Sequence, residues 1–354
     1  MPDISRIYPS DRNAMAKVDA LLAGEGIRRD ANLDYICGIY DEDYHLIATG
    51  SCFGNTLRCF AVDHKRQGEG LLNTVVGHLM EYQPQRGNSR VFLYTKCSAA
   101  RFFRDLGFHE IACVEGSLVF MENLRKGFSD CLQRFRDETR KAMGNRDETP
   151  GTIAAIVMNA NPFTLGHQYL VEKAAGENGL VHLFLVSEDA SLVPFAVRKR
   201  LVEEGIRHLG NVVLHPSGPY IISQATFPSY FQKDDADVSR SHALLDVTIF
   251  GTIAEELGIT RRYMGEEPFS QVTGIYNQVM AERLPQRGIE CVVIPRRESR
   301  GAAISASNAR ELLKNGDFRA LAGLVPPSTL EYFQSEEATP VLETIRRAKH
   351  IAHH

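Results

Sequence analysis

The chain has 354 residues, 44% of them hydrophobic and 24% charged, which is typical of a globular protein long enough for two domains. Forty Lys and Arg against 44 Asp and Glu give a formal charge of -4, so no basic excess indicates a nucleic-acid partner. No apolar run approaches the roughly 20 residues of a membrane helix, and the polar start is not a signal peptide. We therefore expect a cytoplasmic protein without a membrane partner.

Its seven scattered Cys form no CxxC pair, and most are expected to be reduced and buried.

Short, β-rich runs separated by polar turns dominate the first part of the chain. They predict strands at Tyr35–Tyr40, Leu46–Cys52, Leu57–Val62 and Val91–Tyr94. Between the third and fourth runs, apolar residues recur at three-to-four spacing across Leu71–Tyr82, which predicts a helix. The pattern indicates an α+β domain over residues 1–125.

A glycine-containing turn joins the third predicted strand to this helix. VDHKRQGEGLL (62–72) resembles the RxxGxG pyrophosphate loop of the GNAT acetyltransferase family, and SAARFFRDLGFHEI (98–111) resembles that family's late helix and turn. The resemblance implies a GNAT-like acyl-CoA fold whose loop amides hold a coenzyme A pyrophosphate. Lys65 replaces the usual Arg or Gln and no general base is evident, so we expect binding of CoA or a pantetheine-like carrier arm rather than acetyl transfer. The candidate contacts are Lys65, Arg66, Gly68 and Gly70.

The chain becomes strongly charged between Asn123 and Pro150, which predicts a helical linker over residues 126–150. Beyond it, apolar strands alternate with helices, and the strand candidates are Ile153–Met158, His182–Val186, Val212–His215, Arg262–Met264 and Cys291–Ile294. Such alternation predicts a parallel sheet with crossover helices over residues 151–354. The expected fold class is α/β, with a Rossmann-like parallel sheet preceded by the α+β domain.

A polar turn follows the first strand of the second half and runs into a helix. Ligands of parallel sheets gather outside the carboxyl ends of the strands, and a helix amino terminus offers N–H groups to phosphate. Within the turn, Gly166 permits close backbone approach, Asn161 and Thr164 offer neutral hydrogen bonds, and His167 can donate to phosphate oxygens. From these residues alone, a capping residue beside a half-buried histidine is an equal alternative.

Two motifs together favour a nucleotide site. NPFTLGH resembles the HxGH signature of the nucleotidylyltransferase superfamily, with Thr164 at the first His position, and ISASNAR (304–310) resembles its late ISxSxxR motif. Ser305 and Ser307 can cap a helix there while Arg310 supplies a forked cation. A Ser-capped surface helix is the alternative for the second motif alone, but the two motifs occur in the expected order.

Further segments narrow the resemblance to the citrate lyase ligase family over nearly the whole chain: NANPFTLGHQYLVE, HLFLV, YIISQATFPSYF, and GEEPF followed by YNQ. This resemblance implies an acid–thiol ligase that uses ATP and Mg²⁺ to convert acetate into acetyl-AMP. The acetyl group then passes to the phosphoribosyl-dephospho-CoA thiol of the citrate lyase acyl carrier subunit, and AMP and pyrophosphate leave. The alternatives are an adenylyltransferase acting on a phosphorylated small acceptor and a CoA-sensing binding protein.

Adenylation of a carboxylate needs no side-chain nucleophile, so positioning and electrostatics suffice. The candidates for stabilising the reacting phosphate are His167, Thr164 and Arg310. The candidate ATP-binding residues are Asn159, Asn161, Phe163, Gly166, Arg198, Gly265, Glu266, Ser305 and Ser307. Structural alternatives stay open for Arg198, on a solvated helix face, and for Glu266, as a helix cap. YIISQATFPSYF is either a lining for acetate or the carrier arm, or core. The metal ligands are not predicted.

Overall fold

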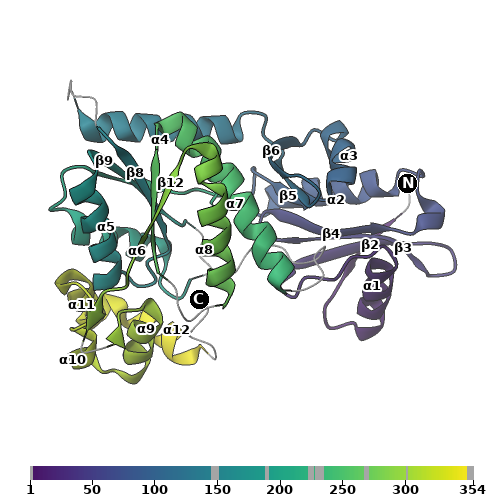
Figure 1. Cartoon of the computed structure of the whole chain (residues 1–354). Coiled ribbons are helices and arrows are strands. Elements are labelled where there is room, and N and C mark those ends of the chain that lie inside the picture. The colour runs from purple at the N-terminus through teal and green to yellow at the C-terminus, as the bar shows by residue number, and fades with distance from the viewer. Residues whose placement is uncertain are drawn as a thin grey trace. The chain divides into compact units, whose positions relative to one another are not determined.

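The computed structural model describes residues 3–144, 151–187, 191–221, 227, 235–266, 271–299 and 302–348 (Figure 1). The chain divides into two compact units: unit 1 comprises residues 1–127 and 228–248, and unit 2 comprises residues 128–227 and 249–354. The predicted linker beyond residue 144 and most of the aromatic segment 220–231 lie outside the described residues. In the described part of the chain, no helix is long and apolar enough to cross a membrane.

The described residues of unit 1 form a seven-stranded sheet with the order β1-β2-β3-β4-β5-β7-β6. Its strands are β1 (Ile4–Ile7), β2 (Tyr35–Tyr40), β3 (Leu46–Phe53), β4 (Thr56–Val62), β5 (Phe92–Thr95), β6 (His109–Val114) and β7 (Leu118–Glu122). Neighbours are antiparallel except β4 and β5, which are parallel and joined by a helical crossover, as parallel pairing requires. The four strands predicted in this part of the chain are confirmed.

Helices cover both faces of the unit 1 sheet. They are α1 (Arg12–Gly24), α2 (Leu71–Gln85) and α3 (Ala100–Asp105), with short 3₁₀ turns η1 (His64–Arg66) and η2 (Cys97–Ala99). Val75 and Leu79 of α2 pack with Cys37 of β2, whereas Leu22 of α1 packs with Ile36 on the opposite face. Adjacent residues of β2 thus pack into two separate hydrophobic cores, one on each face of the sheet, because successive side chains of a strand point to opposite faces.

The described residues of unit 2 form a five-stranded sheet with the order β10-β9-β8-β11-β12, and every neighbouring pair is parallel. Its strands are β8 (Ile153–Met158), β9 (Leu180–Leu185), β10 (Val212–Pro216), β11 (Arg261–Gly265) and β12 (Glu290–Ile294). The predicted α/β class and parallel sheet are therefore confirmed. Strands β9 and β10 lie to one side of β8, and β11 and β12 lie to the other. The strand order reverses beside β8, where open parallel sheets bind ligands.

The remaining helices belong mainly to unit 2, and α7 (Asp235–Leu257) has residues in both units (Figure 1). They are α4 (Gly127–Met143), α5 (Leu165–Glu177), α6 (Phe195–Ile206), α7 (Asp235–Leu257), α8 (Gln271–Arg283), α9 (Ala306–Asn315), α10 (Phe318–Leu321), α11 (Pro327–Gln334) and α12 (Thr339–Arg347), with η3 (Pro285–Arg287), η4 (Glu336–Ala338) and the short strands β13 (Glu298–Ser299) and β14 (Ala302–Ala303). Leu183 of β9 belongs to the core formed with α5 and α6, whereas Phe184 meets Phe135 of α4 on the other face.

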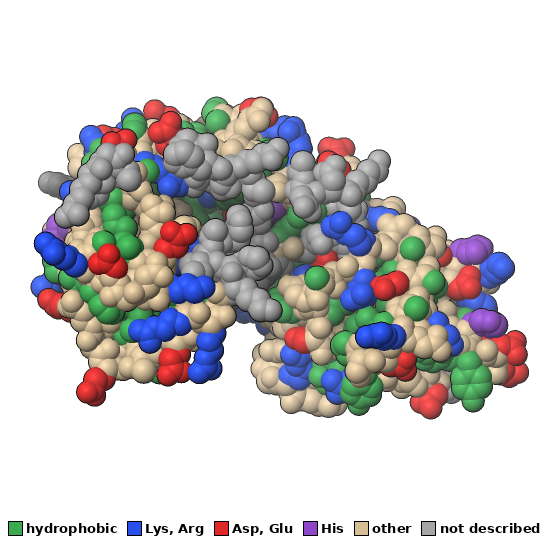
Figure 2. All heavy atoms as spheres, turned by 90° about the horizontal axis from the view of Figure 1, so that it is seen from below, with side chains coloured by type: hydrophobic (Ala, Val, Ile, Leu, Met, Phe, Trp, Pro, Cys, Tyr) green, Lys and Arg blue, Asp and Glu red, His purple; other side chains and the backbone are tan. Residues whose placement is uncertain are grey.

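The surface carries both signs of charge. On the face seen in Figure 2, basic and acidic side chains are interspersed over each unit. Four of the seven cysteines are buried, as expected for most of them: Cys37, Cys52, Cys59 and Cys131. Cys97 and Cys113 are exposed, and Cys291 is partly buried.

Candidate active site

The loop between β8 and α5 is held by buried polar contacts. The Asn161 side-chain carbonyl accepts a hydrogen bond from the backbone N–H of Val193 at 3.0 Å. Phe163 is fully buried against Gly205 of α6, where an added methyl carbon would lie only 2.4 Å from the Phe163 ring. The glycine therefore makes room for the aromatic side chain, and the loop is fixed where β8 ends.

Arg198 holds the same loop from α6. Its side chain is 0% exposed, which contradicts a position on a solvated helix face. The guanidinium donates to the backbone oxygens of Asn159 at 2.8 Å, Val186 at 2.8 Å and Val193 at 2.9 Å, and to the Asn159 side-chain oxygen at 2.9 Å. Arg198 thus joins the segments that follow β8 and β9. Asn159 also exchanges hydrogen bonds with the hydroxyl of Ser191.

Thr164 and His167 form a capping box at the start of α5. The Thr164 hydroxyl oxygen accepts from the His167 backbone N–H at 3.4 Å, while the Thr164 backbone N–H donates to His167 Nδ1 at 3.1 Å. The Thr164 hydroxyl lies 3.0 Å from the same ring nitrogen. Because the backbone donor fixes Nδ1 as an acceptor, we assign the proton of the neutral ring to Nε2. An N–H group is thereby left for a ligand.

The surroundings of His167 keep its ring neutral. Loss of hydration, followed by the positive charges of Arg296 and Arg310, lowers the pKa of His167 to about 4. The residue retains partial exposure to solvent, so the ring is reachable although protein atoms crowd it. At neutral pH it therefore offers a hydrogen bond rather than a positive charge.

The second motif lies directly against the first. Arg310 is buried in α9 and donates to the Asn161 backbone oxygen at 2.5 Å and to the Ser307 hydroxyl at 3.2 Å. A methyl carbon on Gly166 would lie 3.3 Å from the backbone oxygen of Ile304, so the start of α5 touches the segment leading into α9. Ser305 caps α9 by accepting from the Asn308 N–H at 3.0 Å. Burial lowers the pKa of Arg310 to about 10, which leaves it cationic at neutral pH.

The ends of β11 and β12 supply a further cation. The backbone N–H of Glu266, just beyond Gly265, donates to the backbone oxygen of Ile294 at 2.9 Å. Arg296 Nε donates to the backbone oxygen of Glu266 at 2.8 Å. Gly265 is exposed, and a methyl group there would meet no atom within 4 Å. Arg296 was not predicted, although it follows the carboxyl end of a strand, where ligand contacts are expected.

The glycine turn of unit 1 borders a cavity of about 530 Å³. Arg66, Gly68 and Gly70 line it, whereas Lys65 does not. Its other walls come from Glu25, Ile27, Phe60, Ala61, Val62, Gln67, Leu71, Leu72, Asn73 and Phe102. Gly70, with a φ of 75°, precedes α2 and provides no side-chain cap, so the first amides of that helix face the turn without one. The structure brings three of the four predicted residues together.

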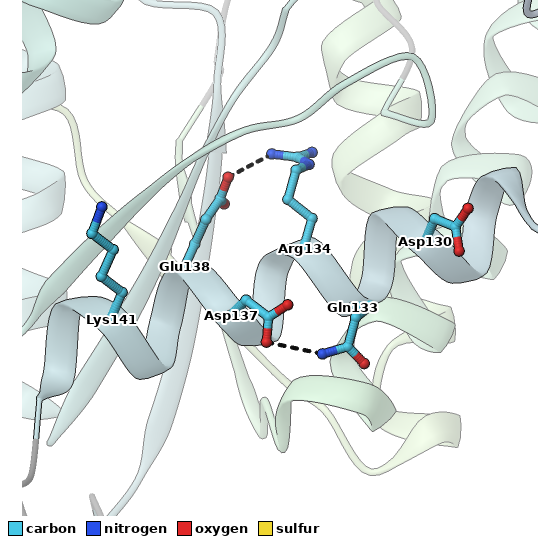
Figure 3. A pocket seen from close by; sticks show the side chains of 6 residues that line it. All are labelled: Asp130, Gln133, Arg134, Asp137, Glu138 and Lys141. Carbon is cyan, nitrogen blue, oxygen red and sulfur yellow. Dashed lines mark hydrogen bonds and ion pairs between the residues drawn. The ribbon is translucent and has the colours of Figure 1, made fainter.

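A cavity of about 400 Å³ also lies along α4, lined by Asp130, Gln133, Arg134, Asp137, Glu138 and Lys141 (Figure 3). Arg134 pairs with Glu138 at 2.8 Å and Gln133 with Asp137 at 2.9 Å, so these groups largely satisfy one another. All six come from a single helix, unlike the convergent groups around His167. We place the candidate active site in unit 2, at the loop after β8.

One other prediction concerns the aromatic segment 220–231. Tyr220 is 0% exposed and Phe227 6% exposed, which favours the core alternative for the described part of YIISQATFPSYF. Within the described ranges, no group of three His, Cys, Asp or Glu side chains is arranged to hold a metal ion.

Two solved acetyltransferases are similar to about a third of this chain. An acetyltransferase of the GNAT family from Staphylococcus aureus is 13% identical and covers 34% of this chain and 98% of its own, with a TM-score of 0.30. The ribosomal-protein-S18-alanine N-acetyltransferase of Escherichia coli is 18% identical and covers 34% of this chain and 92% of its own, with a TM-score of 0.27.

Sequence comparison reaches across both units. The family model described as the citrate lyase ligase C-terminal domain matches residues 153–333. The [citrate [pro-3S]-lyase] ligase of Klebsiella pneumoniae is 38% identical over 91% of this chain and 93% of its own. The enzyme of the same name from Escherichia coli K12 is 36% identical over 94% of this chain and 93% of its own. The chain therefore belongs to the citrate lyase ligase family.

Proposed function

We propose that this chain is an ATP-dependent acid–thiol ligase that activates acetate as acetyl-AMP and acetylates the prosthetic-group thiol of the citrate lyase acyl carrier subunit. The observation that best supports this is the contact of Arg310 with the Asn161 backbone oxygen at 2.5 Å, next to His167. It joins the two nucleotide-binding motifs where the strand order reverses, in a chain similar to named ligases along most of its length.

In this proposal the triphosphate lies at the amino terminus of α5. The N–H groups of Leu165 and His167 have protein acceptors, whereas the Gly166 N–H donates to no described residue and faces the ligand. His167 Nε2–H adds a neutral donor, and Arg310 and Arg296 add positive charge. The site thus combines the groups that suit a polyanion.

The first step joins acetate to the α-phosphate. A carboxylate oxygen of acetate attacks the α-phosphorus, the bond from that phosphorus to the oxygen bridging the β-phosphate breaks, and pyrophosphate leaves. Negative charge grows on the non-bridging and leaving oxygens, where fixed donors such as His167 Nε2–H stabilise the transition state. Thr164 acts by orienting the His167 ring.

Magnesium fits this proposal as part of the nucleotide substrate. The absence of a three-ligand cluster among the described side chains is compatible with an ion that arrives on the phosphate oxygens of ATP. When bound, Mg²⁺ neutralises phosphate charge and helps to align the leaving pyrophosphate.

The second step transfers the acetyl group to the carrier. The carrier thiolate attacks the acetyl carbonyl carbon, a carbon–sulfur bond forms, the carbon–oxygen bond to the phosphate breaks, and AMP leaves. In our proposal, unit 1 binds the CoA-like part of the carrier arm in its 530 Å³ cavity, with Arg66 and the amides near Gly68 and Gly70 facing the phosphates. Lys65 lies one residue before this lining.

Isotope exchange tests the proposed activity. The full chain with Mg²⁺ and ATP should incorporate radioactive pyrophosphate into ATP only when acetate is present, and labelled acetate should then appear on the carrier thiol. Exchange that instead needs a phosphorylated small acceptor would identify an adenylyltransferase. No exchange, with CoA binding intact, would identify a CoA sensor, and either outcome would contradict the ligase.

Calorimetry tests the unit 1 cavity separately. Arg66→Ala should weaken CoA binding several-fold, because a guanidinium lining the cavity is lost. Arg104→Ala is the matched control, since both arginines form exposed ion pairs within unit 1, Arg66 with Glu69 and Arg104 with Glu110. Equal affinities for both variants would remove Arg66 from the site, and turnover of acetyl-CoA with an amine would replace the carrier-arm role with acetyl transfer.

A further inference from the structure

Two exposed thiols lie together at one end of the unit 1 sheet. Cys97 begins η2, one residue beyond the end of β5, and Cys113 lies on β6, the edge strand beyond β7. The Cys97 thiol donates to the Val114 backbone oxygen at 3.6 Å, the carbonyl of the residue that follows Cys113. Both cysteines are free and exposed, and Thr95, two residues before Cys97, pairs with the same residue of β7 as Cys113 does, Val119.

The other cysteines of unit 1 have a different environment. Cys37, Cys52 and Cys59 are buried in the sheet, and burial raises the pKa of each thiol to about 12. A buried, protonated thiol is a poor nucleophile, whereas an exposed thiol beside a second thiol can react and then be resolved. Among the described residues of unit 1, Cys97 and Cys113 are the thiols with access to solvent.

We propose that Cys97 and Cys113 are a modification site at which a small-molecule disulfide, such as oxidised glutathione, forms a reversible intramolecular disulfide. One thiolate attacks a sulfur of oxidised glutathione, forming a mixed disulfide and expelling one glutathione thiolate. The second cysteine thiolate then attacks the protein sulfur of that mixed disulfide and expels the other glutathione. The two cysteines are oxidised, one oxidised glutathione is reduced to two glutathione molecules, and their thiol protons balance.

The surroundings of Cys113 influence its ionisation. Its partial burial, the neighbouring Cys97 thiol and the carboxylates of Glu110 and Glu115 raise the pKa of Cys113. Either cysteine can make the first attack, and the other then resolves the mixed disulfide. Proximity makes the second step intramolecular and faster than attack by another glutathione.

Peptide mapping of the full chain tests the proposal. Trypsin cuts after Lys96, Arg101, Arg104 and Arg125, so the two cysteines fall in separate peptides. After incubation of the native protein with oxidised glutathione, we expect a linked 97–101/105–125 peptide, loss of two titratable thiols and no retained glutathione. Dithiothreitol should separate the peptides and restore both thiols.

Two variants sharpen the test. Cys113→Ser should retain a glutathione adduct at Cys97, because the resolving thiol is missing, whereas Cys291→Ser should form the linked peptide as the unsubstituted chain does. The proposal is overturned if the unsubstituted chain accumulates glutathione adducts without the linked peptide, or shows no reaction at either cysteine.

Discussion

The neighbours of His167 determine which ring nitrogen carries the proton, and they keep the ring neutral. The Thr164 backbone N–H occupies Nδ1, and the pKa of about 4 keeps the ring neutral above pH 5. Because the folded-state pKa lies below the ordinary value of about 6.5, the ring becomes protonated, and so positively charged, only in acid. The contribution of His167 to turnover should therefore be constant from about pH 5.5 to 8.

Replacement of His167 tests this role. His167→Ala should lower kcat by on the order of a hundredfold or more while the fold is kept, because a donor to the reacting phosphate is lost. His208→Ala is the control, since His208 is exposed and pairs only with Glu172 in the described structure. Steady-state kinetics of acyl adenylation would report both, and equal kinetics for the two variants would remove His167 from the site.

Arg310 combines charge with a structural contact. Arg310→Ala should mainly raise the Michaelis constant for ATP, with a milder loss of kcat, and it should lower the free energy of unfolding by about 1–3 kcal/mol because the Asn161 carbonyl loses a buried donor. Arg319→Ala, at an exposed position of α10, should change neither quantity. An unaltered Michaelis constant for ATP in Arg310→Ala would count against this assignment.

At the scale of elements, the site depends on how closely α5 approaches the segment before α9. Gly166→Ala adds a methyl group 3.3 Å from the Ile304 oxygen, so the segments must separate slightly. Alanine favours a helix by up to about 1 kcal/mol over glycine, so thermal stability should hold while the Michaelis constant for ATP rises several-fold. Gly176→Ala, in the same helix with no atom within 4 Å, should gain stability without a kinetic change. Identical kinetics for both variants would contradict the close-approach argument.

A buried polar chain couples α4 to the sheet. Nδ1 of His182, on β9, lies 3.0 Å from Nε2 of His215, on β10. Nδ1 of His215 lies 2.6 Å from the Glu138 carboxylate. Burial lowers the pKa of His182 to about 3 and also lowers that of His215. Burial alone would raise the pKa of Glu138, but the hydrogen bond from His215 and the charge of Arg134 outweigh it and lower that pKa.

These pKa shifts predict that the free energy of unfolding decreases as the pH falls. As the pH falls below about 6.5, the unfolded chain binds protons on both histidines before the folded chain does, so the free energy of unfolding decreases. The loss should reach on the order of 3 kcal/mol near pH 4, where the lowered pKa of Glu138 adds to it. Urea unfolding across this range should show a flatter dependence for His182→Leu than for His208→Ala. Equal slopes would contradict the buried-histidine account.

The apolar pattern predicted all five strands of the unit 2 sheet and four of the seven strands described in the unit 1 sheet, because burial imposes alternating or continuous apolar runs, but it did not predict β1, β6 or β7. The sequence analysis left Arg198 between an ATP contact and a solvated helix face, although Leu201 and Val202 lie three and four residues further along the same helix and place it on the buried face. The contact of His182 with His215 depends on the pairing register of β9 and β10, which is a long-range property. Arg296 was missed because its position matters only once β12 lies beside β11.

At the scale of the whole molecule, each unit contains a candidate phosphate-binding turn between a strand and a helix. In unit 2 the turn meets two arginines and a neutral histidine, whereas in unit 1 it borders an apolar-walled cavity with Arg66. In our proposal, this difference favours unit 2 for the reacting nucleotide and unit 1 for the carrier arm. The assignment is consistent with relatives whose similarity extends over both units.

The most direct test is a crystal structure of the full chain with magnesium and a non-hydrolysable ATP analogue. We expect triphosphate density at the amino terminus of α5, within hydrogen-bonding distance of His167 Nε2 and the Gly166 N–H and facing Ser305 and Arg310. Nucleotide bound instead in the unit 1 cavity, or away from His167 and Arg310 in unit 2, would contradict it.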